Sequence, residues 1–365
     1  MPENLKDKRL EQIEEKLDSG ARLDKEDALL LYQSKDILSI GRLADKMRRQ
    51  RHGKKAFYVY NQHLNYSNVC RNRCLFCAYA KDAGQDGAFT LSFADIEKRI
   101  LERIEEPVQE IHIVGGLNPA FDFDYFLDLI KVVKKHRPQT TVKAFTAVEI
   151  DYLSDISGLT LQETIAELKK AGLEMLPGGG AEVMSERVRQ KLFPRKISYQ
   201  RWLQIMQAVH EAGLPSNATM LYGHIETLEE RVEHLFLLRE LQDKTAGFSA
   251  FIPLAFHSQN TKLPHLPATT AFDDLKNIAA ARLVLDNFPH IKAYWVMIGE
   301  SLAQLALSFG ADDLDGTIIE EKITHMAGAK SAKGLTQNQI EDLIREAGYS
   351  PVQRDSYYRA VKNDL

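Results

Sequence analysis

The chain has 365 residues, of which 44% are hydrophobic and 27% charged, and its formal net charge is −4 at pH 7. This length and composition predict a globular protein with one large core, and the interspersed charges argue against a nucleic-acid-binding protein. No apolar run reaches the roughly 18–20 residues that span a bilayer, and the charged N-terminus lacks the apolar segment of a signal peptide. We therefore expect a soluble, cytoplasmic protein without a membrane partner.

The first 52 residues predict helices. Apolar residues recur at helical spacing from Leu5 to Leu17, and Ser19-Gly20 ends that segment. Asp24 and Asp36 each precede an amphipathic segment, where a side-chain oxygen can cap the free backbone N–H groups of a helix start. We assign residues 1–52 to an N-terminal helical extension.

From residue 53 to residue 316, short apolar runs alternate with amphipathic segments, which predicts βαβ units and a parallel sheet. Eight repeats over roughly 260 residues match the usual size of a (β/α)8 barrel of the TIM type. Strands are predicted near 56–62, 109–114, 141–147, 173–177, 217–222, 247–253, 291–297 and 312–316. Helices are predicted near 92–105, 122–136, 161–171, 184–191, 198–212, 227–242, 271–287 and 299–308. The last strand has the weakest pattern, so an open six-stranded barrel remains an alternative.

Residues 317–365 predict a short C-terminal tail that packs on the barrel. The tail carries one amphipathic segment, from Thr336 to Ala347, and Gly348 follows as a helix C-cap. No internal repeat or low-complexity linker marks a second folded domain.

All three cysteines of the chain lie in one loop after the first predicted strand: Cys70, Cys74 and Cys77. Their C-x3-C-x2-C spacing can bring three thiolates onto three irons of a [4Fe–4S] cluster and leave the fourth iron open to a ligand. The end of a barrel strand is where α/β barrels carry their active sites. A zinc-stabilised, non-enzymatic scaffold is the alternative, but structural zinc usually needs further Cys or His ligands, and the only nearby histidine is His63.

The cysteine motif, with Phe76 just before its third cysteine, resembles the signature of the radical S-adenosylmethionine (SAM) enzymes. The resemblance implies a radical SAM barrel with a [4Fe–4S] cluster, whose open iron is chelated by the amino and carboxylate groups of SAM. One electron from the cluster then cleaves SAM and yields a 5′-deoxyadenosyl radical.

Further SAM-binding positions follow from the same resemblance. The Gly115-Gly116 pair resembles the Gly-Gly-Glu element whose backbone meets the methionine ammonium of SAM, although Leu117 replaces the Glu. Glu149 is a candidate to accept hydrogen bonds from the SAM ribose. Arg195 or Lys196 is a candidate to pair with the SAM carboxylate. For each charged residue a surface or helix-capping position remains an alternative.

Nearly the whole chain, from about residue 20 to residue 355, resembles the branch that holds the menaquinone futalosine-pathway enzymes and the deazaflavin synthases. The stretches 113–117, 144–150, 216–227, 251–257 and 321–329 most resemble the aminofutalosine synthases. The resemblance implies that the radical adds to the enol-ether double bond of 3-[(1-carboxyvinyl)oxy]benzoate, giving 6-amino-6-deoxyfutalosine, carbon dioxide and methionine, so that SAM is consumed. Dehypoxanthine futalosine cyclase, or another reaction of the branch, remains an alternative.

The dicarboxylate substrate of that reaction needs cations or hydrogen-bond donors. Polar residues near predicted strand ends supply the candidates: His63, Asn217, Tyr222, His224 and His257. The resemblance also implies an electron donor such as flavodoxin or ferredoxin, and a nucleic-acid partner is not expected.

Overall fold

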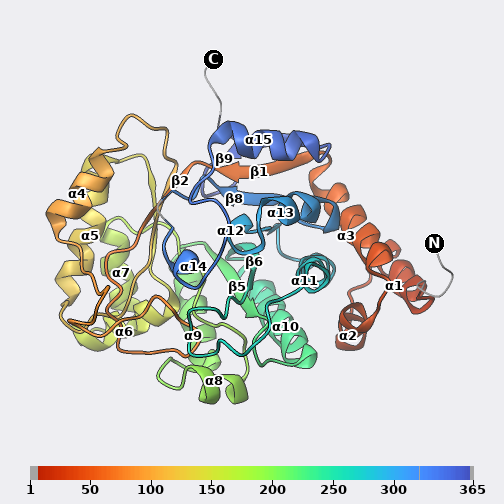
Figure 1. Ribbon diagram of the computed structural model, residues 1–365, viewed down its shortest axis with the longest axis horizontal. Coiled ribbons are helices and arrows are strands. Elements are labelled where there is room, and N and C mark those ends of the chain that lie inside the picture. The colour runs from red at the N-terminus through yellow and green to blue at the C-terminus, as the bar shows by residue number, and fades with distance from the viewer. Residues whose placement is uncertain (1–6, 320, 362–365) are drawn as a thin grey trace.

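The computed structural model of the protein describes residues 7–319 and 321–361, in which helices alternate with parallel strands (Figure 1). The strands are β1 (Lys55–Val59), β2 (Asn61–Leu64), β3 (Glu110–Ile113), β4 (Thr141–Ala144), β5 (Ser216–Tyr222), β6 (Phe248–Ala255), β7 (His290–Ile291), β8 (Asp313–Gly316) and β9 (Ser350–Arg354). The helices up to β5 are α1 (Arg9–Asp18), α2 (Lys25–Gln33), α3 (Ile37–His52), α4 (Phe93–Leu101), α5 (Phe123–His136), α6 (Ala147–Ser157), α7 (Leu161–Ala171), α8 (Glu186–Leu192) and α9 (Tyr199–Glu211). The helices after β5 are α10 (Leu228–Thr245), α11 (Ala271–Val284), α12 (Trp295–Ile298), α13 (Glu300–Ala306), the 3-10 turn η2 (Leu307–Phe309), α14 (Ile323–Met326) and α15 (Gln337–Glu346).

Helices α2 and α3 begin where the sequence predicts, whereas the start of the first predicted helical segment at Leu5 lies outside the described residues. The side chain of Asp24 accepts a hydrogen bond from the Asp27 N–H, the Asp27 carboxylate accepts one from the Asp24 N–H, and Asp36 caps α3 at the Ser39 N–H. Helix α3 packs against α11 and η2, and α2 packs against α10 and α11, so the extension lies against the helices of the C-terminal half (Figure 1). The domain boundaries at residues 52 and 316 stay a prediction.

The strands form three parallel sheets, in the orders β8-β1-β9, β2-β3-β4 and β5-β6-β7. Single parallel bridges lie between these sheets, at Lys143–Met175, Leu176–Ser216, Lys292–Asp313 and Gln62–Ile319. The predicted α/β class with parallel strands is therefore confirmed. No helix of the described residues is long and apolar enough to cross a lipid bilayer.

Two predicted strands are much shorter than expected. Residues 173–177 contribute only single bridges at Met175 and Leu176. In the predicted strand 291–297, β7 ends at Ile291, Lys292 adds one bridge to Asp313, and α12 follows. The cause is Trp295, whose indole N–H donates to the Gly316 carbonyl at 2.9 Å and whose ring is buried, which turns the chain inward.

The C-terminal tail contains a strand as well as the predicted helix, since Thr336 caps α15 as expected and β9 follows. Strand β9 pairs with β1 in parallel from Lys55–Ser350 to Val59–Arg354. The description of the tail as helical was therefore incomplete. Pro351, which cannot donate a ladder hydrogen bond, sits in a strand that ends its sheet, where proline is tolerated.

Buried ion pairs connect β3 with β4, and the residue that follows β7 with β8. Lys143 pairs with Glu110 at 3.1 Å and Lys292 with Asp315 at 3.2 Å, and these side chains are almost fully buried. Although burial opposes ionisation of Glu110, the charge of Lys143 holds its pKa well below the usual range. Because each buried charge has a partner, these charges are tolerated in the interior.

Candidate functional site

A cavity of about 340 Å³ opens at the carboxyl ends of the strands, and we call it the central cavity. Its wall contains segments that follow β2, β3 and β4, inward-facing residues of β5 and β6, and residues of the C-terminal segment 321–327. Cys70, Cys74 and Cys77 all line it, as do seven other predicted site residues: His63, Phe76, Gly115, Gly116, Glu149, Lys196 and His257. Functional groups from distant parts of the chain thus meet where an α/β fold usually carries its active site.

The cysteine loop is tied to its neighbours by backbone hydrogen bonds. The Cys70 N–H donates to Lys81 O at 3.1 Å, the Arg71 N–H to Leu117 O at 3.1 Å, and the Leu75 N–H to Leu192 O at 2.8 Å. Cys74 is buried, whereas Cys70 and Cys77 are half-buried. These bonds hold the cysteine loop against its neighbours, with all three cysteines lining the cavity.

The thiols are set in surroundings that disfavour free thiolates. Burial raises the pKa of the Cys74 thiol to about 12, and burial also raises the pKa of Cys77, although backbone N–H groups of Tyr79 and Ala80 point at its sulfur and oppose the effect. A cationic metal core is the kind of partner that makes such cysteines deprotonate. Amide N–H groups aimed at a ligating sulfur are a common way to tune an iron–sulfur cluster.

The cysteine donor set differs from the histidine-rich group that could hold a single ion. Within residues 7–319 and 321–361, the side chains that come close enough together to hold one ion are His52, His290 and Asp312, and the three cysteines do not form such a group. In that histidine group, Asp312 already pairs with Arg282 and with His290. Three soft sulfur donors that line one cavity match the ligand set of a [4Fe–4S] cluster.

The two glycines after β3 let the backbone approach the cysteine loop closely. A Cβ atom on Gly116 would lie 2.2 Å from Val69 O and 3.0 Å from the Cys70 Cβ, and one on Gly115 would lie 2.6 Å from the Tyr66 ring. The Gly116 N–H also donates to Ser67 O at 2.8 Å. Only glycine fits at these positions, and the Gly115-Gly116 segment lies against the cysteine loop.

Glu149 lines the cavity, but both of its carboxylate oxygens already have protein partners. One accepts from the Tyr66 hydroxyl at 2.8 Å and from the Gly115 N–H at 3.3 Å, and the other accepts from the Thr146 N–H at 2.7 Å at the start of α6. Burial raises the pKa of Glu149. Glu149 therefore fixes the Gly-Gly segment, and its contact with a ribose stays a prediction.

Of the two basic candidates, only Lys196 reaches the cavity. Its ammonium pairs with Glu182 and lies 5.3 Å from the centre of the Phe76 ring. Although burial opposes it, the charge of Glu182 raises the pKa of Lys196, which therefore carries a positive charge inside the cavity. Arg195 is exposed and donates to Arg71 O at 3.1 Å, at the rim of the cysteine loop.

Three of the predicted substrate-binding residues lie outside the cavity lining. The Tyr222 hydroxyl donates to Asp274 at 2.8 Å, and His224 pairs with Glu226 at 2.8 Å with its side chain fully buried. Asn217 is buried two residues before Thr219, the first residue of β5 that lines the cavity. A direct contact of these residues with substrate stays a prediction.

Other polar residues that line the cavity were missed by the sequence analysis: His112, Tyr294, Asp315, Glu321 and Thr324. Glu110 and His112 occupy alternate positions of the otherwise apolar strand β3, and that alternation was the available signal. For Tyr294 and Glu321 no local pattern distinguishes a cavity position from a surface one.

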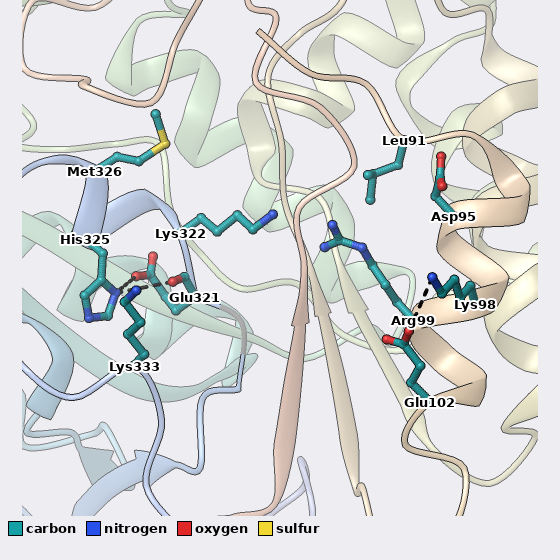
Figure 2. Close-up of a pocket in the computed structure, with 10 residues that line it drawn as sticks. All are labelled: Leu91, Asp95, Lys98, Arg99, Glu102, Glu321, Lys322, His325, Met326 and Lys333. Atoms are coloured by element: carbon teal, nitrogen blue, oxygen red, sulfur yellow. Dashed lines mark hydrogen bonds and ion pairs between the residues drawn. The ribbon is translucent and has the colours of Figure 1, made fainter. Parts of the chain in front are cut away.

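A second, outer groove of about 770 Å³ lies between α4 and the segment 321–333 (Figure 2). Figure 2 shows Arg99 and Lys322 extending toward each other from its two sides. Glu321 lines both the groove and the central cavity, and its carboxylate accepts hydrogen bonds from the Thr324 N–H at 2.8 Å and from His325 at 3.0 Å. Glu321 thus belongs to the wall that separates the two spaces.

Comparisons with known proteins identify related sequences over almost the full length. Residues 64–238 match the radical SAM superfamily, and residues 245–364 match the CofH/MqnC C-terminal region. The chain is 46% identical to an aminodeoxyfutalosine synthase of Thermus thermophilus, across 98% of this chain and 97% of the relative. It is 39% identical to an aminodeoxyfutalosine synthase of Streptomyces coelicolor, across 96% and 94% of the two chains. The crystal structure of methylornithine synthase (PylB) has a similar fold, with a TM-score of 0.72 at 16% identity over 93% of this chain and 97% of that one.

Proposed function

The chain belongs to the radical SAM superfamily, in the branch that carries the CofH/MqnC C-terminal region, and we propose that it is an aminodeoxyfutalosine synthase of menaquinone biosynthesis. The observation that carries the proposal is the 46% identity to such an enzyme over 98% of the chain. The reaction joins SAM to 3-[(1-carboxyvinyl)oxy]benzoate and gives 6-amino-6-deoxyfutalosine, carbon dioxide and methionine. The three cysteines that line one cavity support the same proposal.

The cysteine side of the central cavity would hold the iron–sulfur cluster and SAM. Cys70, Cys74 and Cys77 would ligate three irons, and the fourth would be left for SAM. When bound, the cluster and SAM supply a 5′-deoxyadenosyl radical, and the protein supplies binding, orientation and electrostatics.

The other residues on this side of the cavity would orient SAM. The backbone of Gly115-Gly116 lies beside the cysteine loop and can accept the methionine ammonium, while the Lys196 ammonium can pair with the methionine carboxylate. Glu149 holds the Gly115 N–H in place. A reacting carbon and an alkene must be held roughly 3–3.5 Å apart for efficient addition, and the enclosing walls exclude water from the reactants.

We also infer that the three sheets belong to one (β/α)8 barrel. The bridges at Lys143–Met175 and Leu176–Ser216 connect β4 to β5 through residues 175 and 176, and the bridge at Lys292–Asp313 connects the β7 segment to β8. Strand β8 pairs with β1, which continues through Tyr60 into β2. This order returns to its starting strand, as a closed barrel requires.

The proposed reaction needs one electron from outside the protein, and we propose a low-potential carrier such as flavodoxin or ferredoxin as its source. A reduced carrier is expected to support turnover with the purified enzyme. Failure of both carriers, while a chemical reductant supports turnover, would exclude this part of the proposal.

The function is tested by anaerobic reconstitution with iron and sulfide, followed by incubation with SAM, a reductant and 3-[(1-carboxyvinyl)oxy]benzoate. We expect a product with the mass of 6-amino-6-deoxyfutalosine, and none from a parallel incubation with dehypoxanthine futalosine, the substrate of the sister cyclase. The opposite result would assign the chain to the cyclase.

The Cys74→Ala variant should lose the cluster absorbance and the product but keep the wild-type melting temperature. A colourless protein that contains zinc and no iron would contradict the proposal.

A further inference from the structure

The floor of the central cavity carries two histidines side by side. His63 and His112 belong to β2 and β3 themselves, whereas the SAM-binding candidates follow the strands, so the histidines lie deeper in the barrel. The parallel register pairs His63 with His112, and their ring centres lie 4.6 Å apart. Tyr294, which follows β7, lines the same cavity.

These three side chains direct polar atoms into the cavity. Within residues 7–319 and 321–361, the two imidazoles and the Tyr294 hydroxyl form no hydrogen bond with a protein group. Their polar atoms are also not among the fully buried atoms that lack a partner, so they remain accessible from the cavity. By contrast, the His257 ring bonds to Met297 O at 2.8 Å. The floor therefore offers hydrogen-bonding groups that only a ligand or solvent can satisfy.

The charged groups around the histidines are already paired. Glu110 and Lys143 pair with each other, Asp315 pairs with Lys292, and Glu321 bonds to His325. Nearby positive charges or hydrogen bonds lower the pKa of each of the three carboxylates against the effect of burial. Burial lowers the pKa of His63 and of His112, so both rings are neutral in the empty cavity at neutral pH.

We propose that His63, His112 and Tyr294 bind a carboxylate of the substrate, and that the histidine pair takes up one proton when the acid binds. The inference rests on the proposed function, whose substrate carries two carboxylates. An ionised carboxylate that leaves water needs hydrogen bonds and an opposite charge. With both imidazoles neutral, the floor of the cavity supplies hydrogen-bond donors but no unpaired cation, so a proton has to supply the charge. A carboxylate beside the imidazoles favours the charged ring, and repulsion at 4.6 Å between the ring centres limits the pair to one proton.

The pH dependence of binding follows from this uptake. Because the complex holds one more proton than the free enzyme, the dissociation constant rises with pH, by up to about tenfold per pH unit, between the pKa of the free pair and that of the bound pair. The groups that face the pair are Glu110, Lys143, Asp315 and Glu321. The carboxylates stay ionised over this pH range, so the histidines are expected to cause the change of the dissociation constant with pH.

The test is calorimetric binding of 3-[(1-carboxyvinyl)oxy]benzoate to the reconstituted enzyme without reductant, where no turnover occurs. Titrations in two buffers with different heats of ionisation, at several pH values between about 6 and 9, measure the proton uptake directly. Wild-type enzyme should take up close to one proton per site. His63→Gln and His112→Gln should each weaken binding by about 10- to 100-fold, the range of one hydrogen bond to a charged group. The double variant His63→Gln/His112→Gln should abolish the uptake. Tyr294→Phe should weaken binding and keep the uptake.

Controls separate this inference from the proposed function and from damage to the fold. His265→Gln, at an exposed histidine, should change neither binding nor uptake, and cluster absorbance and SAM binding should be normal in every variant. Wild-type enzyme that forms the product but binds substrate without proton uptake would overturn the inference alone. Persistent uptake in the double variant would also overturn it and would point to Lys143. Wild-type enzyme that neither binds nor converts the substrate would overturn the proposed function and the inference with it.

Discussion

The backbone of Gly116 lies directly against the carbonyl group of Val69, so that a Cβ atom at position 116 would come within 2.2 Å of that oxygen. Val69 immediately precedes Cys70, the first cysteine of the cysteine loop. The distance between strand β3 and the loop is therefore set by the absence of a side chain at one position.

Gly116→Ala should displace the cysteine loop and impair cluster assembly. A shift of about 1 Å at a catalytic centre can cost about 100-fold in rate, so we expect at least that loss of turnover together with a lower iron content. Gly334→Ala is the matched control, because its Cβ would lie 3.5 Å from its nearest neighbour, an ordinary contact. Normal iron content and turnover in Gly116→Ala would show that the loop tolerates the displacement.

Lys196→Met should weaken SAM binding, because the ammonium is the cation that this side of the cavity offers to a carboxylate. Loss of one charge-assisted hydrogen bond corresponds to about 10- to 100-fold in the dissociation constant, measured by equilibrium binding. Since the substitution leaves Glu182 without its partner, the double variant Lys196→Met/Glu182→Gln should show the same loss without a stability defect. Arg195→Gln, at the exposed neighbour, should bind SAM normally, and an equal loss in that variant would contradict the assignment.

Arg354→Met should destabilise the whole fold, because it leaves the buried Asp313 carboxylate without its charge partner at 2.5 Å. Breaking one side of a buried ion pair typically costs about 3–5 kcal/mol. The free energy of unfolding in urea should fall by that amount and partly recover in the double variant Arg354→Met/Asp313→Asn. A loss below about 1 kcal/mol, within the range of exposed pairs, would mean that the Arg354–Asp313 pair contributes little to the stability of the fold.

His325 should make stability depend on pH in the alkaline direction. The hydrogen bond to Glu321 raises the pKa of His325 to about 8, above its ordinary value of 6.5. Protonation of His325 is therefore more favourable in the folded state than in the unfolded state. Its contribution to the free energy of unfolding is complete below pH 6.5 and is lost as pH rises through about 8. Solvent screening at this half-buried site reduces it to about 1 kcal/mol. The difference in unfolding free energy between wild type and His325→Gln should therefore be present at low pH and absent at high pH, and a constant difference would contradict the assignment.

Most of the longer helices and the cysteine loop were predicted from the sequence because their signals are local, although α6 was not predicted. Asp24, Asp36 and Thr336 cap helices through contacts with residues three positions away, and the cysteine motif lies within eight residues. Periodicity and capping require no knowledge of distant parts of the chain.

The parts that were missed depend on distant contacts. Strand β9 is defined by its pairing with β1, and the turn at Trp295 by a hydrogen bond to Gly316. The cavity position of His112 depends on which face of β3 points inward, which neighbouring strands decide. His224 and Tyr222 were predicted as site residues because polar residues follow an apolar strand. In the structure Nδ1 of His224 pairs with Glu226 and the Tyr222 hydroxyl donates to Asp274, and a role of either residue in substrate binding stays a prediction.

The pairing of β9 with β1 also bears on synthesis of the protein. Lys55 pairs with Ser350, 295 positions later in the chain, so the ribosome exposes one edge of β1 long before its partner exists. At about 5–20 residues per second, that interval lasts roughly 15–60 s. An unpaired strand edge is prone to associate with other chains. Until translation reaches the final strand, this edge of β1 is therefore open to association with other chains.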